Sequence, residues 1–280
     1  MKYAKMKLNK GVWYMKTVVI TGSARGLGLE MAKVFRKNNL NVIISDLNLD
    51  KLELAKQELE KIDSNSKVDI YTCDVTKSSD IANLINFTKE KFNDIDIWIN
   101  NAGVNQPEKP IWELTEREID LVLDVDLKGA IIGSKLVMEE MIKQKSGAIY
   151  NIEGYGSNDA KMLGLSIYGT SKRAITYFTE ALAKEADERR TNVIVGKLSP
   201  GIMITDFITN ALGDKEKIYL SEKTKKVYNI LGDYPDVVAN FLVNGMLKNT
   251  KNNVKIEWLT TRKAVWRFMT AGFNKRDFFK

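Results

Sequence analysis

Residues 17–28 read TVVITGSARGLG, a short β-branched run that leads into a glycine-rich turn. The run predicts a buried strand, and the amphipathic segment after the turn predicts a helix. Gly22, Gly26 and Gly28 allow the backbone to turn tightly and to approach a pyrophosphate, which then rests on the N-terminus of that helix. This order of strand, turn and helix therefore predicts a dinucleotide-binding unit rather than an isolated turn.

The rest of the chain repeats the alternation of strand and helix. Further strands are predicted at residues 41–45, 68–72, 95–99, 148–152, 192–198 and 254–258. Helices are predicted at residues 27–38, 49–62, 78–92, 113–143, 168–189 and 235–248. Because no predicted strand is joined to the next by a hairpin turn, we expect right-handed βαβ crossovers and a parallel sheet. The fold class is therefore α/β, a single-domain, Rossmann-like, doubly wound parallel β-sheet with helices on both faces.

The charge of the chain is concentrated at its two ends. Residues 1–16 carry five Lys and no acid, and residues 251–280 carry eight Lys or Arg against two acids, out of a net charge of +7. The body between them is not a basic surface, so we expect no nucleic-acid partner. We expect a basic N-terminal extension at 1–15, a Rossmann-type domain at 16–258 with a mobile substrate lid at about 202–233, and a basic aromatic tail at 259–280.

The absence of His and the single Cys limit the kinds of catalytic and metal site that the chain can form. The chain has no His and a single Cys, Cys73, which excludes Ser–His–Asp and Cys–His nucleophiles and leads us to expect no metal site. The single Cys, the start without an apolar core and the lack of a run of roughly 18 apolar residues favour a cytoplasmic protein. Acid–base chemistry therefore falls to Tyr, Lys, Asp or Glu.

Residues 149–174 carry side chains that are suited to such chemistry. They read IYNIEGYGSNDAKMLGLSIYGTSKRA and lead from a strand through a glycine-containing loop into a helix. Tyr168 and Lys172 are four residues apart, so both project from one side of that helix. An ammonium group beside a phenol favours the phenolate and lowers the pKa of the tyrosine, which suits it to proton exchange. The structural alternative is an amphipathic helix with a buried Tyr and a solvated Lys.

Two residues bear on the choice of cofactor. Asp46 ends the second predicted strand, 18 residues after Gly28, where the dinucleotide fold places an acid that binds the ribose hydroxyls. A carboxylate there repels a 2′-phosphate, so NAD is favoured over NADP. Arg25 is able to bind a 2′-phosphate, so NADP is not excluded as the cofactor. Asp46 as a helix cap or turn residue is the structural alternative.

With these motifs the chain resembles the short-chain dehydrogenase/reductase family over residues 16–205. The glycines have the family's TGxxxGxG spacing, and the other motifs follow in its order, namely Asp74-Val75, NNAG at 100–103, YGTSK at 168–172, and Pro200-Gly201 with Thr205. The resemblance implies an NAD(P)-dependent oxidoreductase that interconverts an alcohol and a carbonyl, with Tyr168 as general acid and base. It also implies a homodimer or homotetramer.

The resemblance assigns roles along the cofactor. Asp74 and Val75 flank the adenine, Lys172 holds the nicotinamide ribose, and residues 200–205 cover the nicotinamide ring. The expected cofactor-binding residues are Gly22, Arg25, Gly26, Leu27, Gly28, Asp46, Asp74, Val75, Asn101, Ala102, Gly103, Tyr168, Lys172, Pro200 and Thr205. The expected catalytic residues are Tyr168, Lys172, Ser157 and Asp126.

Ser157 and Asp126 mark departures from the family's pattern. The usual catalytic Ser aligns near Gly154, and the nearest Ser is Ser157, which either binds the substrate oxygen or caps its own loop. The usual Asn of the central helix falls on Asp126, which either holds the water chain that re-protonates Lys172 or over-stabilises its ammonium group. The acid–Gly–x–Gly–Ser loop at 153–157 is similar to that of a subgroup resembling the chlorophyll b reductases, whose pigment substrate we do not carry over.

Three further expectations concern partners. Apolar side chains flank the predicted cleft and favour an apolar carbonyl or alcohol as substrate, namely Met162, Leu163, Leu165, Met203, Ile204, Phe207, Ile208 and Leu212. The alternative function is an NAD(H)-binding sensor or scaffold module with weak or lost catalysis, which the changes at Ser157 and Asp126 suggest. The tail is either a basic, aromatic helix on an anionic membrane or an arm packed on the body or a neighbouring subunit.

Overall fold

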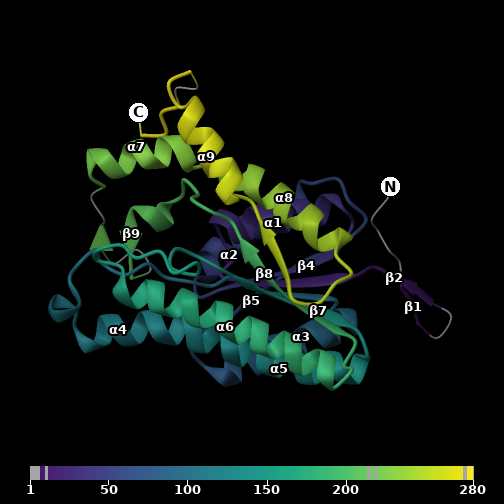
Figure 1. The fold of residues 1–280 in the computed structure, drawn as a ribbon. Coiled ribbons are helices and arrows are strands. Elements are labelled where there is room, and N and C mark those ends of the chain that lie inside the picture. Colours follow the sequence, from purple (N-terminus) through teal and green to yellow (C-terminus); the bar gives the residue numbers. More distant parts are fainter. Residues whose placement is uncertain (1–6, 10–11, 213–215, 218–219, 274–275, 280) are drawn as a thin grey trace.

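A seven-stranded parallel sheet forms the centre of the molecule (Figure 1). The computed structural model describes residues 7–9, 12–212, 216–217, 220–273 and 276–279. The sheet order is β11-β8-β7-β6-β3-β4-β5, and each of its pairings is parallel. Its strands are β3 (Thr17–Thr21), β4 (Asn41–Asp46), β5 (Val68–Thr72), β6 (Ile97–Asn100), β7 (Gly147–Ile152), β8 (Val193–Ser199) and β11 (Val254–Glu257). The predicted α/β fold is confirmed.

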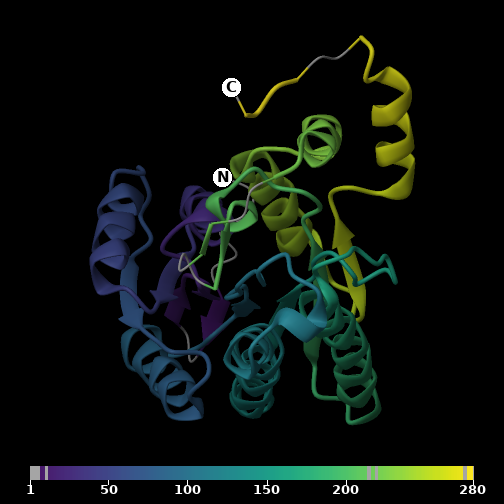
Figure 2. The same cartoon turned by 90° about the vertical axis from the view of Figure 1, so that its left-hand side faces the viewer.

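Helices cover both faces of this sheet, as Figures 1 and 2 show from two sides. Val18 and Ile20 of β3 point into one apolar layer with α1, α2 and α8, whereas Val19 points into the other with α3, α5 and α6. This alternation follows from the two-residue period of a strand. The helices are α1 (Gly26–Lys37), α2 (Leu49–Glu60), α3 (Ser78–Phe92), α5 (Ala130–Gln144), α6 (Ser166–Glu188) and α8 (Pro235–Lys248).

The predicted central helix at 113–143 is interrupted. It begins with a 3₁₀ turn, η1 (Ile111–Glu113), continues as α4 (Glu116–Leu123), passes through a π-helical segment, η2 (Asp124–Gly129), and ends as α5. A π-helical segment adds one residue to a turn and often occurs at functional sites. Here it contains Asp126, so the interruption lies at one of the expected catalytic residues.

Two short antiparallel pairs lie outside the large sheet. In the predicted N-terminal extension, β1 (Lys7–Asn9) pairs with β2 (Val12–Tyr14). In the predicted lid, β9 (Asn210–Ala211) pairs with β10 (Glu216–Lys217), and the lid also contains η3 (Asp206–Ile208) and α7 (Glu222–Leu231). The expected absence of hairpins therefore holds for the large sheet and is wrong for these two segments.

The C-terminal tail packs against the lid end of the molecule. Figures 1 and 2 both show α9 (Thr261–Thr270) and the segment after it beside α7. Arg267 Nη1 lies 2.7 Å from a carboxylate oxygen of Asp233, and Arg276 Nη1 lies 3.2 Å from the other. The indole N–H of Trp258 donates to the same carboxylate at 2.6 Å. The arm packed on the body is thus the arrangement present. Within the described ranges, no helix has the length and apolar character needed to cross a membrane.

Candidate active site

Helix α1 begins at the glycine-rich turn without a side-chain cap. Arg25 occupies the N-cap position but its side chain makes no capping hydrogen bond, and the first turn contains no acid. A Cβ atom built on Gly26 would meet no atom within 4 Å. Open space therefore borders the electropositive start of the helix at Gly26, whereas Leu27 and Gly28 are buried behind it. This arrangement fits the pyrophosphate of a dinucleotide.

The NNAG segment packs directly on this turn. The side-chain amide of Asn101 donates to the carbonyls of Thr21 at 2.9 Å and Gly22 at 2.8 Å. The Thr21 hydroxyl accepts the backbone N–H groups of Asn101 and Ala102, each at 3.1 Å. A Cβ atom on Gly22 would lie 2.6 Å from Ala102 Cα, so only glycine permits this approach. The two predicted cofactor motifs therefore form one rigid wall.

Asp46 lies beside the glycine-rich turn. Its two carboxylate oxygens accept the backbone N–H groups of Ala24 at 3.3 Å and Leu47 at 2.8 Å. The neighbouring strand end is tied to the same turn, since the N–H of Ser23 donates to the carbonyl of Ser45 at 3.0 Å. The carboxylate is thus held at the carboxyl end of β4, which fits the predicted contact with the adenosine ribose.

Asp74 and Val75 follow β5 on the same edge of the sheet. The Asp74 carboxylate accepts both the N–H and the hydroxyl of Thr76, at 3.0 and 2.7 Å, and lies 3.4 Å from Lys77 Nζ. Val75 lies against the π-helical segment, because a Cβ atom on Gly129 would be 3.1 Å from Val75 Cγ2. The side chain of Asp74 therefore shapes its own turn, and the predicted contact of this pair with adenine stays a prediction.

Lys172 and Asp126 form a buried ion pair next to Tyr168. Lys172 Nζ lies 2.8 Å from Asp126 Oδ2, and the two side chains are 6% and 0% exposed. The other carboxylate oxygen accepts the N–H of Val104 at 2.7 Å, and Gly103 packs against the same carboxylate. Lys172 Nζ also lies 5.4 Å from the centroid of the Tyr168 ring. The structure therefore brings three of the four predicted catalytic side chains together beside the NNAG wall.

This environment raises the pKa of Tyr168 instead of lowering it. Burial is the largest cause and brings the pKa to about 12, with Lys172 opposing the shift and Asp126 adding to it. Burial also raises the pKa of Asp126. Burial disfavours the ammonium form of Lys172, but the adjacent Asp126 carboxylate outweighs it and the pKa of Lys172 is raised. Lys172 lowers the pKa of Tyr168 as expected, but the net direction is the opposite of the expected one, since burial outweighs the effect of Lys172 and Asp126 adds to the rise.

Gly154 packs against the hydroxyl end of Tyr168. A Cβ atom at this position would lie 2.4 Å from Tyr168 Oη and 3.0 Å from Lys172 Cγ, so there is no space for the family's usual Ser. The Ser157 hydroxyl accepts the N–H of Gly154 and donates to the carbonyl of Lys172, each at 3.2 Å. These contacts favour the loop-capping alternative for Ser157, and its role toward a substrate stays a prediction.

The predicted lid runs from the glycine-rich turn to Tyr168. At one end, Arg25 Nη1 lies 3.8 Å from Asp206 Oδ2, and both side chains are largely exposed. At the other end, the centroids of the Phe207 and Tyr168 rings are 6.0 Å apart. The predicted nicotinamide-covering residues, Pro200 and Thr205, belong to the segment that leads into η3. Helix η3 therefore lies beside both the glycine-rich turn and the predicted catalytic residue Tyr168.

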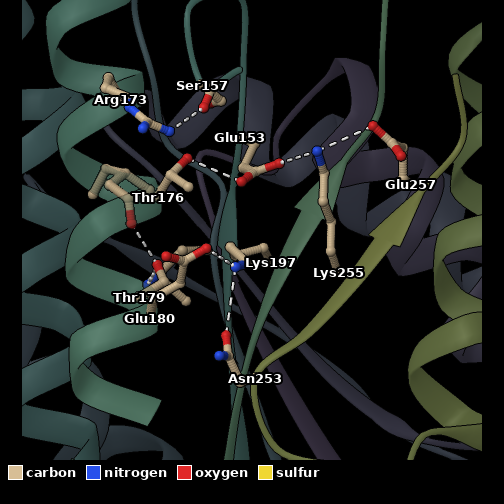
Figure 3. A network of polar contacts seen from close by, with 12 residues as sticks. Glu153, Ser157, Arg173, Thr176, Thr179, Glu180, Lys197, Asn253, Lys255 and Glu257 are labelled. Carbon is tan, nitrogen blue, oxygen red and sulfur yellow. Dashed lines mark hydrogen bonds and ion pairs between the residues drawn. The ribbon is translucent and has the colours of Figure 1, made fainter. Parts of the chain in front are cut away.

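A buried polar network behind the loop involves Glu153, which the sequence analysis named only as the acid of its motif. Figure 3 shows Glu153 between Thr176 of α6 and Lys255 of β11. Its carboxylate accepts the Thr176 hydroxyl at 2.9 Å and lies 3.3 Å from Lys255 Nζ, which is 3.0 Å from Glu257. The network fastens the end of β7 to α6 and to the edge strand. It therefore holds the loop that contacts Tyr168.

Two residues near Tyr168 were missed altogether. Gln106 is buried and accepts the backbone N–H groups of Ile167 and Tyr168, each at 2.9 Å. Tyr228 of α7 is near enough for its charge to act on Tyr168, and burial raises the pKa of Tyr228. Neither residue belongs to a periodic pattern or a motif, so the sequence carried no signal for them. No group of Cys, Asp and Glu side chains in the described part of the chain is arranged to hold a metal ion.

Comparison with known proteins places this geometry in a family. The short chain dehydrogenase family matches residues 16–216. The probable chlorophyll(ide) b reductase NYC1 of Arabidopsis thaliana, named chloroplastic, is 30% identical over 280 aligned residues, which cover 94% of this chain and 54% of that protein. The chlorophyll(ide) b reductase NOL of Oryza sativa subsp. japonica, also named chloroplastic, is 33% identical over 267 residues, covering 92% and 76%. The chain spans about half the length of the first of these relatives.

Solved structures show the same fold. The crystal structure of levodione reductase superposes with a TM-score of 0.77 at 22% identity, covering 89% of this chain and 98% of that one. NAD⁺-bound xylitol dehydrogenase superposes with a TM-score of 0.75 at 23% identity, covering 86% and 96%. The family match extends from β3 past the predicted catalytic helix and includes every strand of the large sheet except β11. The chain belongs to the short-chain dehydrogenase/reductase family.

Proposed function

We propose that the protein interconverts an alcohol and a carbonyl group, with Tyr168 as the general acid and base. The observation that carries this proposal is the cluster in which Lys172 pairs with Asp126 at 2.8 Å beside the Tyr168 ring. A nicotinamide cofactor supplies or accepts the hydride when it is bound. Tyr168 gives its hydroxyl proton to the carbonyl oxygen in one direction and takes the alcohol proton in the other.

In this proposal Lys172 and Asp126 act on Tyr168 and on the cofactor ribose. The ammonium group of Lys172 hydrogen-bonds the ribose and stabilises a phenolate at Tyr168. Asp126 keeps the lysine protonated, because its carboxylate raises the pKa of Lys172 against the effect of burial. The test is a panel of carbonyl compounds with NADH and NADPH, followed by the loss of reduced-cofactor absorbance. Oxidation of neither cofactor with any compound would contradict the proposal.

We propose NAD as the preferred cofactor. Asp46 supports this choice, since its carboxylate is fixed beside the glycine-rich turn by two backbone N–H groups and repels a 2′-phosphate. Arg25 supports NADP less well, because its guanidinium group lies 3.8 Å from the carboxylate of Asp206. Dissociation constants for NADH and NADPH, measured by fluorescence, decide between them. Tighter binding of NADPH would reject the choice.

We propose a bulky, apolar carbonyl compound or alcohol as the substrate. Phe207 lies beside Tyr168, and Met162 and Leu163 of the neighbouring loop expose their side chains to solvent. The similarity to proteins named chlorophyll(ide) b reductases supports a bulky substrate, so chlorophyllide b belongs in the panel. Preference of the enzyme for small, charged carbonyl compounds would contradict this substrate class.

Gly154→Ala is expected to lower kcat by on the order of a hundredfold, since misplacement of a reacting group by about 1 Å has that effect. The added methyl group would lie 2.4 Å from Tyr168 Oη and displace the hydroxyl. Gly169→Ala is the matched control, because a Cβ atom there meets its nearest atom at 3.9 Å. Steady-state kinetics of both variants measure the effect. Equal kcat values for the two would contradict the proposed position of the hydroxyl.

The second candidate function is an NAD(H)-binding sensor or scaffold with weak catalysis. The observation that favours it is the net rise of the Tyr168 pKa to about 12, which works against proton exchange near neutral pH. Binding of NADH without turnover of any compound in the panel would support this candidate. A homodimer or homotetramer and a cytoplasmic location also stay predictions, and light scattering measures the first of these.

We propose a peripheral membrane contact through the outward face of α9. Trp266 and Met269 are exposed three residues apart on α9, one turn after the exposed Arg262, and Phe273 is exposed in the turn that follows the helix. Apolar side chains flanked by cations are typical of interfacial helices. The triple variant W266S/M269S/F273S is expected to lose most of its co-sedimentation with anionic liposomes, while keeping the cofactor affinity of the wild type. Equal co-sedimentation of the wild type and the triple variant would contradict the proposed membrane contact.

A further inference from the structure

The helix that carries Tyr168 begins with a cap supplied by a distant loop. The N-cap residue of α6, Leu165, has no side chain able to accept a hydrogen bond. Instead, the side-chain oxygen of Gln106 accepts the N–H groups of Ile167 and Tyr168, each at 2.9 Å. Its amide nitrogen donates to the carbonyl of Gly164, one residue before the cap. Gln106 thus accepts hydrogen bonds from N–H groups in the first turn of α6 that have no partner within the helix, and one of these is the N–H of Tyr168 itself.

Burial makes this amide a fixed support. Gln106 is 1% exposed, so its rotamer is restricted by the surrounding side chains. Both the oxygen and the nitrogen of the amide make hydrogen bonds, so the amide group cannot be turned by 180° without losing them. A Cβ atom on Gly164 would lie 3.0 Å from the Glu108 backbone, so the loop that holds Gln106 is in close contact with the segment that leads into α6. The start of α6 therefore has little freedom to move relative to this loop.

The loop that holds Gln106 also contacts the other parts of the site. The N–H of Val104 donates to Asp126 at 2.7 Å, and Asp126 is the partner of Lys172. The carbonyl of Asn105 accepts the N–H of Leu212 in the lid at 2.9 Å, and its side-chain amide donates to the carbonyl of Phe207 at 3.3 Å. Consecutive residues therefore contact the ion pair, the lid and the catalytic helix in turn.

We propose that Gln106 is a positioning residue that fixes where the Tyr168 hydroxyl lies relative to the NNAG segment. The proposal rests on the proposed function, because it assigns a purpose to the placement of the Tyr168 hydroxyl. A positioning residue differs from a residue that only stabilises the start of the helix in its effect on kcat. A stabilising cap lowers the melting temperature and leaves kcat of the folded enzyme unchanged, whereas a positioning residue changes kcat.

The matched control is Gln144, which lies at the opposite end of the sheet. Its side-chain oxygen accepts the N–H of Ile95 at 3.0 Å, and its amide nitrogen donates to the carbonyls of Ile95 at 3.0 Å and Ser146 at 3.2 Å. It therefore makes the same kind of backbone contacts as Gln106, ahead of β6 and away from Tyr168. Gln144→Met and Gln106→Met remove equivalent hydrogen bonds with nearly equal side-chain volume.

The experiment measures kcat, KM, NADH affinity and melting temperature for three variants. Gln106→Met is expected to lower kcat on the order of tenfold to a hundredfold, with little change in NADH affinity. Gln106→Glu, assayed at a pH at which its buried carboxyl group is protonated, keeps the acceptor for both N–H groups and a donor for the Gly164 carbonyl, and is expected to recover most of kcat. Gln144→Met is expected to lower the melting temperature only. Wild-type kcat in Gln106→Met, or an equal loss in Gln144→Met, would overturn the proposal.

A second readout does not depend on turnover. The ¹³C signal of the Tyr168 ring in labelled protein is assigned by its loss in Tyr168→Phe. In Gln106→Met this signal is expected to shift, and in Gln106→Glu and Gln144→Met it is expected to stay near its wild-type position. An unshifted signal in Gln106→Met would overturn the positioning role. If the wild type turns over no compound, the proposed function fails and this spectrum still tests Gln106.

Discussion

Tyr168→Phe is expected to reduce kcat by about 10²–10⁴-fold, the usual contribution of a general acid or base. The substitution removes only the hydroxyl group, which packs against Gly154, and leaves the buried ring in place. Lys172 and Asp126 keep their 2.8 Å contact in the variant, because neither depends on the tyrosine oxygen. The measurement is turnover of the best compound of the panel.

Binding of NADH by Tyr168→Phe, followed by fluorescence, is the control for this prediction. Affinity close to that of the wild type is expected, since the NNAG wall and the start of α1 do not contact the Tyr168 hydroxyl. Tyr177→Phe is a second control, because Tyr177 lies on the same helix and is exposed. Wild-type turnover in Tyr168→Phe would remove the assignment of Tyr168 as the acid–base residue.

Asp126→Asn is expected to lower the free energy of unfolding by about 3 kcal/mol, as breaking a buried ion pair usually does. The variant leaves the ammonium group of Lys172 buried without its carboxylate. The pKa of Lys172 is raised above its ordinary value of 10.5, so the stabilisation is complete below that pH and is lost as the pH rises through the raised pKa. The difference in melting temperature should therefore shrink at alkaline pH.

The same variant should move the pH profile of alcohol oxidation. The charge of Asp126 raises the pKa of Tyr168, so its removal lowers that pKa over the pH range in which Lys172 still carries its proton. Oxidation needs the phenolate, and the rise of kcat/KM with pH is expected at lower pH than in the wild type. Asp124→Asn is the control, since its pair with Lys128 is solvent-exposed and contributes less than about 1 kcal/mol. An unshifted profile would contradict the role of Asp126.

The sheet was predictable because its strands are short apolar runs bounded by clear turns. Thr17–Thr21 and Val68–Thr72 begin and end where the sequence pattern places them. The π-helical segment at Asp124–Gly129 was not predictable, since one additional residue in a turn hardly changes the periodicity of apolar side chains. Helix α7 was missed because the lid residues are mixed polar and apolar and pack on the tail.

Residues of the candidate site were predictable where their spacing in the sequence or a family motif pointed to them. Tyr168 and Lys172 share a helical face by their spacing, and the resemblance supplied Asp126. Gln106 was not predictable, because its contacts with α6 span about sixty positions and leave no local pattern. The net direction of the Tyr168 pKa was wrong for a related reason. Burial and the charge of Asp126 depend on tertiary structure, and the spacing of Tyr and Lys reports neither.

The network around Glu153 has a consequence for the order in which the molecule assembles during translation. Glu153 is buried at the end of β7, and its cationic partner, Lys255, lies on β11, the last strand of the sheet to leave the ribosome. A nascent chain that ends before β11 has to bury this carboxylate without a counter-ion, which is unfavourable. The strand that delivers Lys255 therefore completes the support of the loop beside Tyr168, and this loop reaches its final geometry only after β11 has been synthesised.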